Sequence, residues 1–369
     1  MSNAESLLDM IHIVVGTKAQ LIKMAPVMVA LRNLGLPYNY ISTGQHRETM
    51  DDILQNFDLP RARVKIYDGP DVVSIGQMIR WTVFVLWKSL TRRKEIFLDD
   101  NRGIVLVHGD TLSTLLGAFM GKLAGLEVGH VESGLRSFKL WQPFPEEITR
   151  LLTFRLTDHY FCPNQWAVDN LRSHRGKKIN TGGNTLYDSL HKALAKDKPA
   201  ALLLPLLPFG VVTLHRFENF KVRASALRIV ENVERLAAHR PLLFVLHKTT
   251  EFNLRRFGLF ERIATCPSIE LRPRYDYFSF IKILQAAEFV VSDGGSNQEE
   301  CYYMGKPVLL FRNVSERKEG VGENVVVSEF NTKKIDAFIR DPAQFVRSEI
   351  IFPQSPSFVI AQYCKEWAA

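Results

Sequence analysis

The chain has 369 residues, too many for one ordinary hydrophobic core, and 46% of them are hydrophobic, so a globular protein of two domains is expected. Its formal charge of +8 favours an anionic ligand, but the lack of like-charge blocks, Gly/Arg tracts and zinc-ligand spacings leaves nucleic acid a weak option. Four cysteines without a metal-binding spacing indicate a reducing compartment and predict a cytoplasmic protein.

The first half of the chain alternates short apolar segments with helix-length patterns. Strands are expected at IHIVVG, YNYIST, GIVLVHGD, EVGHVES and HYFCPN. Helices are expected between them, for example over KAQLIKMAPVMVALRNLG and around residues 47–57. This alternation predicts a parallel sheet with helices on both faces.

Residues 76–97 have an apolar middle with Arg80 before it and three basic residues after it. The apolar part, from Trp81 to Trp87, is too short to span a bilayer, so no transmembrane segment is expected. Two interpretations remain open for this segment. It is either a helix packed on the sheet or on a partner subunit, or an interfacial basic amphipathic helix.

The second half repeats the plan, with strand candidates at GVVTLHRFEN, PLLFVLHK, SIELRP, FVVSDGG and PVLLFRN. A proline-rich stretch at 202–210 places the linker around residues 193–208. The sequence therefore predicts an α/β protein with one domain over 1–190 and another over 191–356. The last helix, within 357–369, could cross back to the first domain.

Two carboxylates, Asp110 and Glu132, each follow the end of an apolar strand in the first half. Parallel strands end at one edge of a sheet, and open α/β sheets bind ligands at that edge. Asp110 could instead cap the helix that begins near Thr111. A carboxylate after a buried strand, as at Glu132, costs free energy unless it is paired or solvated. Two acids in one crevice would push one pKa upward, as acid–base chemistry near neutral pH requires.

Other polar residues also follow strands. Lys18 and Lys23 surround a helix start that suits phosphate, and PFPEEITR supplies further acids with Arg150. TLHRFEN places His215 and Arg216 after a strand of the second half. The loop SDGGS opens a helix and presents free N–H groups to an anion, although such a loop is about as often a plain turn.

The order and spacing of ten motifs resemble the UDP-N-acetylglucosamine 2-epimerase family. These motifs are GTKAQLIKMAP, TGQHRETM, VHGDTLSTL, GHVESGLRS, PFPEEITR, TGGNTLYDSL, TLHRFEN, SDGGSNQEE, GKPVLLFRN and SERKEGV. The resemblance runs from Gly16 to about Val321. It implies two Rossmann-like doubly wound domains in the GT-B arrangement with an inter-domain cleft, the first on the sugar and acid–base side and the second binding UDP.

The resemblance also implies a reaction. Family members remove the proton at C2 of the sugar and expel UDP by anti elimination, which gives 2-acetamidoglucal. UDP then adds back with protonation on the other face, and some members release free sugar and UDP instead. Neither a metal nor another cofactor is implied, and the partner implied is a second copy of the chain in a homodimer. UDP-ManNAc derivatives usually feed surface polysaccharides.

By motif, the resemblance assigns the catalytic carboxylates to Asp110, Glu132 and Glu146, and the catalytic-site histidine to His215. The substrate-binding residues that it implies are Lys18, Lys23, Arg150, Arg216, His247, Gly295, Ser296, Glu300 and Arg317. A second UDP-sugar, which many bacterial non-hydrolysing members bind, would contact Gln45, His46 and Glu48.

Several positions depart from the usual family pattern. Lys18 and Gln20 stand where the family usually has arginine and glutamate, and lysine lacks the bidentate fork of arginine. Phe217 replaces an arginine of HRREN, which leaves activation by a second UDP-sugar open. In SDGGS the hydroxyl has moved to Ser296. TGGNT carries an extra glycine, and IIFPQSPSF replaces NPYGDG. Together these changes leave the exact sugar open.

Four functions are compatible with these motifs. The first is epimerisation of UDP-GlcNAc or of a related UDP-sugar, such as a diacetamido uronate. The second is a hydrolysing 2-epimerase that releases UDP and ManNAc. The third is a GT-B glycosyltransferase, and the fourth a non-catalytic UDP-sugar sensor. The retained carboxylates Asp110, Glu132 and Glu146 argue against the last two, which have no need of all three.

Overall fold

The computed structural model describes residues 10–46, 50–72, 74–140, 145–199, 202–206, 208–315 and 317–369. The chain divides into two compact units. The first comprises Met1–Ser189 with Phe352–Ala369, and the second comprises Leu190–Ile351. Each unit is built around its own parallel sheet.

The first unit contains a seven-stranded parallel sheet in the order β3-β2-β1-β4-β5-β6-β7. Its strands are β1 (Ile11–Val15), β2 (Tyr38–Ser42), β3 (Val64–Lys65), β4 (Ile104–His108), β5 (Glu127–Val131), β6 (His159–Cys162) and β7 (Lys177–Asn180). Its helices are α1 (Lys18–Asn33), α2 (Met50–Asn56), α3 (Ile75–Thr91), α4 (Arg93–Ile96), α5 (Leu112–Ala124), α6 (Glu146–Leu156), α7 (Gln165–Asp169) and α16 (Pro356–Trp367), and α8 (Leu186–Ala195) leads into the second unit.

The second unit contains a six-stranded parallel sheet in the order β10-β9-β8-β11-β12-β13. Its strands are β8 (Gly210–Thr213), β9 (Leu242–Val245), β10 (Ile269–Arg272), β11 (Phe289–Ser292), β12 (Val308–Leu310) and β13 (Val325–Val327). Its helices are α9 (Phe217–Phe220), α10 (Arg223–Ala237), α11 (Lys248–Arg256), α12 (Phe260–Ala264), α13 (Tyr277–Ala286), α14 (Gly295–Tyr303) and α15 (Thr332–Arg340), with the 3-10 turn Pro342–Phe345.

The two doubly wound parallel sheets confirm the predicted fold class. The strand order reverses between β1 and β4 in the first sheet and between β8 and β11 in the second. In such sheets the reversal leaves a crevice at the carboxyl ends of the strands, where ligands bind. The short strands β3, β7 and β13 were not predicted, because edge strands of two to four residues carry too weak an apolar pattern.

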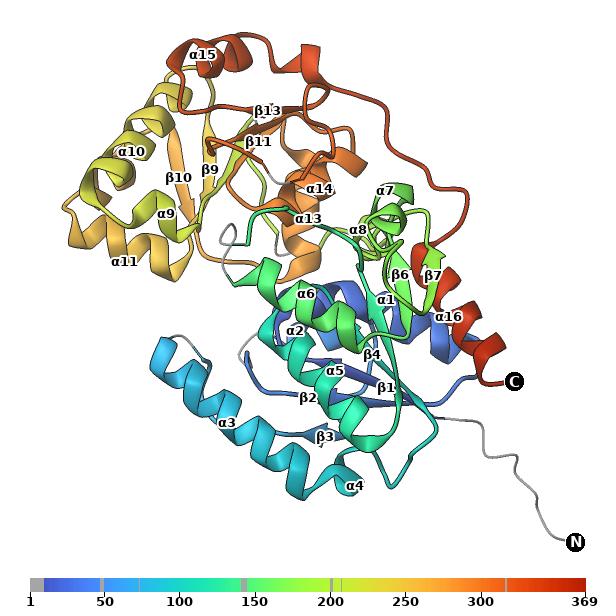
Figure 1. Cartoon of the computed structure of the whole chain (residues 1–369). Helices are drawn as coiled ribbons and strands as arrows, with labels where there is room; N and C mark the ends of the chain where they lie inside the picture. The colour runs from blue at the N-terminus through green and yellow to red at the C-terminus, as the bar shows by residue number, and fades with distance from the viewer. Residues whose placement is uncertain are drawn as a thin grey trace, which may run out of the picture. The chain divides into compact units, whose positions relative to one another are not determined.

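The last helix of the chain, α16, lies beside α1 in the first unit (Figure 1). Ser355 caps its first turn, and the side chain of Asp188 accepts a hydrogen bond from Ser357 N at 2.8 Å. Ile360 and Ala361 are fully buried on the packed face of the helix. The C-terminal segment is therefore part of the core of the first unit.

Helix α3 has one packed face and one exposed apolar face. On the packed face, the Trp81 indole is buried and donates a hydrogen bond to Thr43 O at 3.0 Å. On the other face, four apolar side chains are more than half exposed, namely those of Ile79, Val83, Trp87 and Leu90. A stripe of this kind is typical of an interaction surface. No helix within the described part of the chain is long and apolar enough to cross a membrane.

We expect Ile360→Ala to lower the free energy of unfolding by about 2–5 kcal/mol, because the substitution leaves a cavity beneath α16. Urea titration followed by circular dichroism measures the change. Phe358→Ala on the same helix is the control, since its side chain is 39% exposed and should cost much less. Equal losses for the two variants would show that α16 does not pack as described.

Candidate active site

The carboxyl end of β1 approaches α5 closely at Gly16. A Cβ placed on Gly16 would lie 1.9 Å from Ser113 Oγ, so only glycine fits. The next residue, Thr17, caps α1 in a capping box with Gln20. The Gln20 amide also donates a hydrogen bond to His108 O at 2.8 Å. Gln20 therefore joins the start of α1 to the end of β4. A glutamate at this position could not make this bond, because an ionised carboxylate has no N–H or O–H to donate.

Glu132 follows β5 at this edge and has a left-handed backbone, with φ of 62°. Non-glycine residues adopt this conformation at a cost and keep it only where their neighbours hold them. The Glu132 carboxylate accepts hydrogen bonds from Lys23 Nζ and Asn184 Nδ2, and His108 Nε2 lies 3.5 Å from the same oxygen. The side chains of Glu132 and Lys23 are only 7% and 6% exposed.

Asp110 follows β4, which is paired with β5 as predicted for the strands of the two acids. It does not cap α5, because that cap is Thr111 with its own capping box. The capping interpretation of Asp110 is therefore wrong. Its carboxylate instead forms an ion pair with Arg150, and its carbonyl accepts a hydrogen bond from the Thr149 hydroxyl.

The start of α6 brings further acids to this edge. Glu146 is the first residue of the helix, and its carbonyl accepts a hydrogen bond from Thr149 Oγ1 at 2.8 Å. Thr149 thus ties the backbones of Glu146 and Asp110 together. Glu147 is fully buried and bridges two arginines, with Arg136 Nε at 2.5 Å and Arg150 NH1 at 3.3 Å.

Burial and the neighbouring charges shift the pKa values of His108 and Arg150 in this cluster. Burial lowers the pKa of His108, although Glu132 opposes the shift, so the ring is neutral at neutral pH. Burial also disfavours the charge on Arg150, but Asp110, Glu132 and Glu147 outweigh it and raise the pKa of this guanidinium. Arg150 is therefore a permanent cation among carboxylates.

In the second unit, Asp293 organises the carboxyl ends of β8 and β11. Its buried carboxylate accepts hydrogen bonds from the backbone N–H groups of His215 and Arg216, at 2.9 to 3.1 Å, and from Asn219 Nδ2 at 2.8 Å. The His215 ring stacks on that of His247, with centroids 4.7 Å apart. Burial lowers the pKa of His215, and nearby Asp293 only partly opposes this shift.

Helix α14 begins at Gly295, directly after Asp293 and Gly294, which follow β11. A Cβ on Gly295 would lie 3.0 Å from Arg317 Nε, so this guanidinium covers the helix start. Arg317 donates a hydrogen bond to Glu299 at 2.6 Å. Ser296 is half-buried in the first turn, and Glu300 is buried and accepts a hydrogen bond from Asn297.

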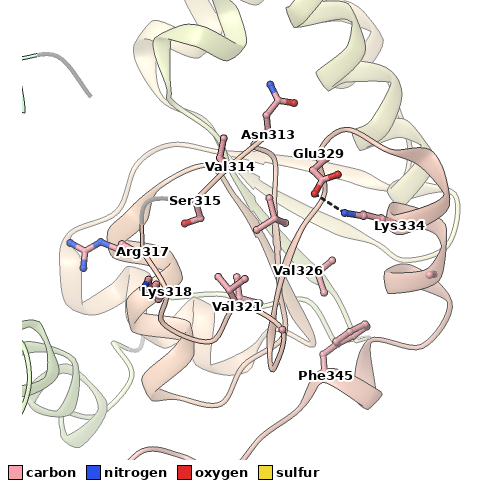
Figure 2. A pocket seen from close by; sticks show the side chains of 14 residues that line it. Asn313, Val314, Ser315, Arg317, Lys318, Val321, Val326, Glu329, Lys334 and Phe345 are labelled. Carbon is pink, nitrogen blue, oxygen red and sulfur yellow. Dashed lines mark ion pairs between the residues drawn. The ribbon is translucent and has the colours of Figure 1, made fainter. Parts of the chain in front are cut away.

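A hollow of about 750 Å³ lies in the second unit between the loop residues 313–315 and 317–322, β13 and α15 (Figure 2). Valines line much of it, and an ion pair of 2.8 Å joins Glu329 to Lys334 at its side. Of the predicted substrate-binding residues only Arg317 borders it, and its guanidinium points away from the middle of the hollow (Figure 2). This hollow is therefore not the predicted UDP site.

Of the residues predicted for a second UDP-sugar, Gln45 and His46 lie near the carboxyl end of β1 in the first unit. Gln45 Oε1 accepts a hydrogen bond from Ser113 at 2.7 Å, and His46 N donates one to Gly16 O at 2.8 Å. Glu48 lies outside the described residues. Lys18 is the first residue of α1 and is half-buried.

Sequence reasoning did not assign roles to Arg136, Glu147, Asn184 and Asp293. The acid in PFPEEITR that is fully buried is Glu147, one residue from the predicted Glu146. Asn184 stood within the quoted motif TGGNTLYDSL, but nothing in the sequence linked it to Glu132. Among the described residues, no group of three or more His, Cys, Asp or Glu side chains could hold a metal ion.

Comparison with known structures first defines the class of fold. The crystal structure of UDP-GlcNAc 2-epimerase from Neisseria meningitidis bound to UDP-GlcNAc is similar, with a TM-score of 0.81 and 26% identity over 97% of this chain and 99% of that chain. The structure of a putative UDP-N-acetylglucosamine 2-epimerase from Listeria monocytogenes is also similar, with a TM-score of 0.82 and 26% identity over 97% of each chain. Both units thus belong to the predicted GT-B class.

The family follows from the sequence comparisons. Residues 30–348 match the model of the family described as UDP-N-acetylglucosamine 2-epimerase. The UDP-N-acetylglucosamine 2-epimerase of Neisseria meningitidis is 31% identical over 329 residues, which cover 85% of each chain. The chain belongs to the UDP-N-acetylglucosamine 2-epimerase family.

We expect Glu147→Gln to destabilise the protein by about 3–5 kcal/mol at neutral pH, because two partly buried arginines lose their shared carboxylate. Burial disfavours ionisation of Glu147, but hydrogen bonds from Ser137 N and Arg136 outweigh it and hold its pKa below the usual 4.5. A depressed pKa stabilises the fold above the unfolded value, and this contribution is lost as pH falls. The difference between wild type and variant should therefore shrink below pH 4.5.

Urea unfolding at a series of pH values measures this difference. Glu95→Gln is the control, because its side chain is 66% exposed and its ion pair with Arg92 should contribute at most about 0.5 kcal/mol. A difference between wild type and Glu147→Gln that stays constant down to pH 3 would refute the assigned ion pairs.

Proposed function

We propose that this protein is a UDP-N-acetylglucosamine 2-epimerase of the non-hydrolysing type, which interconverts UDP-GlcNAc and UDP-ManNAc. The observation that carries the proposal is the arrangement at the carboxyl ends of β4 and β5. There Glu132, whose backbone is strained, accepts hydrogen bonds from Lys23 and Asn184, and Asp110, which follows the neighbouring strand, is paired with Arg150. A strained and nearly buried acid such as Glu132, at an edge where ligands bind, is typical of a functional site.

The chemistry needs a base for the weakly acidic proton at C2. In the proposed reaction one carboxylate of the set Asp110, Glu132 and Glu146 takes this proton. The C2–H electron pair forms the C1–C2 double bond, and the C1–O bond breaks to release UDP. In the return step UDP adds to C1, and an acid delivers a proton to the opposite face of C2. Paired acids with cations beside them can supply both a base and an acid.

The departing diphosphate needs cations and N–H donors in the second unit. The start of α14, at Gly295 and Ser296, presents backbone N–H groups of the kind that bind phosphate oxygens. Arg317 covers this helix start and supplies positive charge. Buried Glu300 suits the ribose hydroxyls, and His215 with its lowered pKa is a neutral donor at neutral pH.

The choice of the non-hydrolysing type rests on Gln45 and His46. Their motif is the one that a second UDP-sugar contacts in such enzymes, and both residues lie beside the end of β1.

We further propose that the enzyme acts in the cytoplasm as a homodimer and supplies surface polysaccharide synthesis, as the resemblance implies. Sedimentation velocity of the purified chain tests the dimer, and a monomer at micromolar concentration would refute it.

Proton NMR of the protein with UDP-GlcNAc in deuterated water tests the function. We expect the C2 proton signal to disappear while UDP-ManNAc accumulates, because the abstracted proton exchanges with solvent. Free ManNAc with UDP in proportion to turnover would identify the hydrolysing type. UDP binding without any exchange at C2 would overturn the proposal in favour of another UDP-sugar or a transferase.

We expect Asp110→Asn and Glu132→Gln each to lower turnover by about 100-fold or more, since each removes an acid–base group. UDP affinity, measured by calorimetry, should change only a few-fold, because the proposed UDP contacts belong to the second unit. Asp51→Asn is the matched control, as this exposed carboxylate in α2 pairs with exposed Arg61 and should leave turnover unchanged. Wild-type turnover in either test variant would remove that residue from the mechanism.

A further inference from the structure

The loop between β7 and α8 carries Asn184, whose amide has one possible orientation. Its Oδ1 accepts a hydrogen bond from Leu186 N at 3.1 Å, so this atom is the oxygen. The other end of the amide is therefore the N–H₂ group, and it donates to Glu132 Oε2. Asn184 is 5% exposed, which protects both hydrogen bonds from water.

Three side chains from three parts of the first unit reach the same oxygen of Glu132. Lys23 comes from α1, Asn184 from the loop before α8, and His108 from the end of β4. Lys23 supplies charge, and neutral His108 is at 3.5 Å. Asn184 is thus the uncharged donor that fixes the direction of a carboxylate whose own backbone is strained.

The conformation of this loop depends on Gly183 and Phe352. A Cβ on Gly183 would lie 2.3 Å from Phe352 Cε2, so the ring occupies the space that a side chain would need. Phe352 is itself held by Tyr187, whose ring is 4.4 Å away between centroids and whose hydroxyl accepts a hydrogen bond from Phe352 N at 3.1 Å. The ring of Phe352 therefore sets the path of the chain directly before Asn184.

Two departures from the usual motifs meet in this contact. Gly183 belongs to TGGNT, which has one glycine more than usual, and Phe352 belongs to IIFPQSPSF, which replaces the usual NPYGDG. Their close approach indicates that the extra glycine accommodates the phenylalanine. Phe352 is also the first residue with which the chain re-enters the first unit.

We infer that Asn184 is a positioning residue for the catalytic carboxylate Glu132, and that Phe352, packed on Gly183, holds Asn184 in place. The inference rests on the proposed epimerase function. A donor to the ionised carboxylate favours its charged form and aims its remaining oxygen, so loss of Asn184 should impair proton abstraction rather than UDP binding. The role is therefore visible in pH dependence as well as in rate.

The first test compares Asn184→Ala with wild type in C2 deuterium exchange across pH. We expect kcat to fall about 10- to 100-fold, as for loss of a hydrogen bond to a charged group. The acid limb of the profile should move up by about one pH unit, while KM stays within a few-fold. Asn180→Ala is the control. Asn180 is exposed at the end of β7, and its side-chain oxygen accepts a hydrogen bond from Gly182 N at 2.9 Å. An unmoved acid limb in Asn184→Ala would overturn the inference.

The second test is a double-mutant cycle on Gly183 and Phe352. Gly183→Ala should lower kcat and move the acid limb as Asn184→Ala does, because the added methyl group strikes the ring. Phe352→Ala alone should also lower kcat, because it removes the ring that holds Asn184. In the double variant the clash is absent, so the double variant should lose less kcat than the product of the two single losses. Losses in kcat that simply multiply would show that the two residues do not act through this contact.

A measurement without substrate separates this inference from the proposed function. Carbon-13 NMR of protein labelled at glutamate carboxyls follows the titration of Glu132, which is assigned by its absence in Glu132→Gln. We expect a higher titration midpoint in Asn184→Ala than in wild type. Lack of C2 exchange by wild type would refute the epimerase alone, whereas equal midpoints in the two proteins would refute the role of Asn184.

Discussion

The arrangement at the carboxyl ends of β4 and β5 in the first unit depends on stabilising the carboxylate of Glu132 where little water reaches it. A buried charge is costly unless cations and hydrogen-bond donors surround it. Lys23, Asn184 and His108 meet this need, and each comes from a different element. His108 and Glu132 meet because β4 and β5 are paired and end at one edge of the sheet, and Lys23 and Asn184 reach this edge from α1 and from the loop after β7.

The second unit uses a buried acid for a different purpose. Asp293 accepts hydrogen bonds from two backbone N–H groups and from Asn219, so its charge is satisfied by the fold itself. It thereby fixes the turn after β8 and orients His215 beside His247. One unit thus holds its acid in a strained conformation among side chains, whereas the other uses its acid to make a loop rigid.

Changes from the usual motifs are accommodated by local packing. Gln20 completes the cap of α1 and also donates to the end of β4, two bonds that explain an amide at this position. Gly183 leaves room for Phe352, so an inserted residue and a replaced segment form one contact. These two departures from the family pattern are therefore each satisfied by contacts within the first unit.

The alternation of apolar strands and helical patterns was sufficient to predict two parallel sheets, with Asp110 and Glu132 at neighbouring strand ends, because these features depend on local periodicity and on the geometry of parallel sheets. The edge strands β7 and β13, the pairing of Asp110 with Arg150, and the bond from Asn184 to Glu132 were decided only by tertiary structure. Each depends on residues far apart in the chain, and no local pattern records which of several possible donors will reach a given carboxylate.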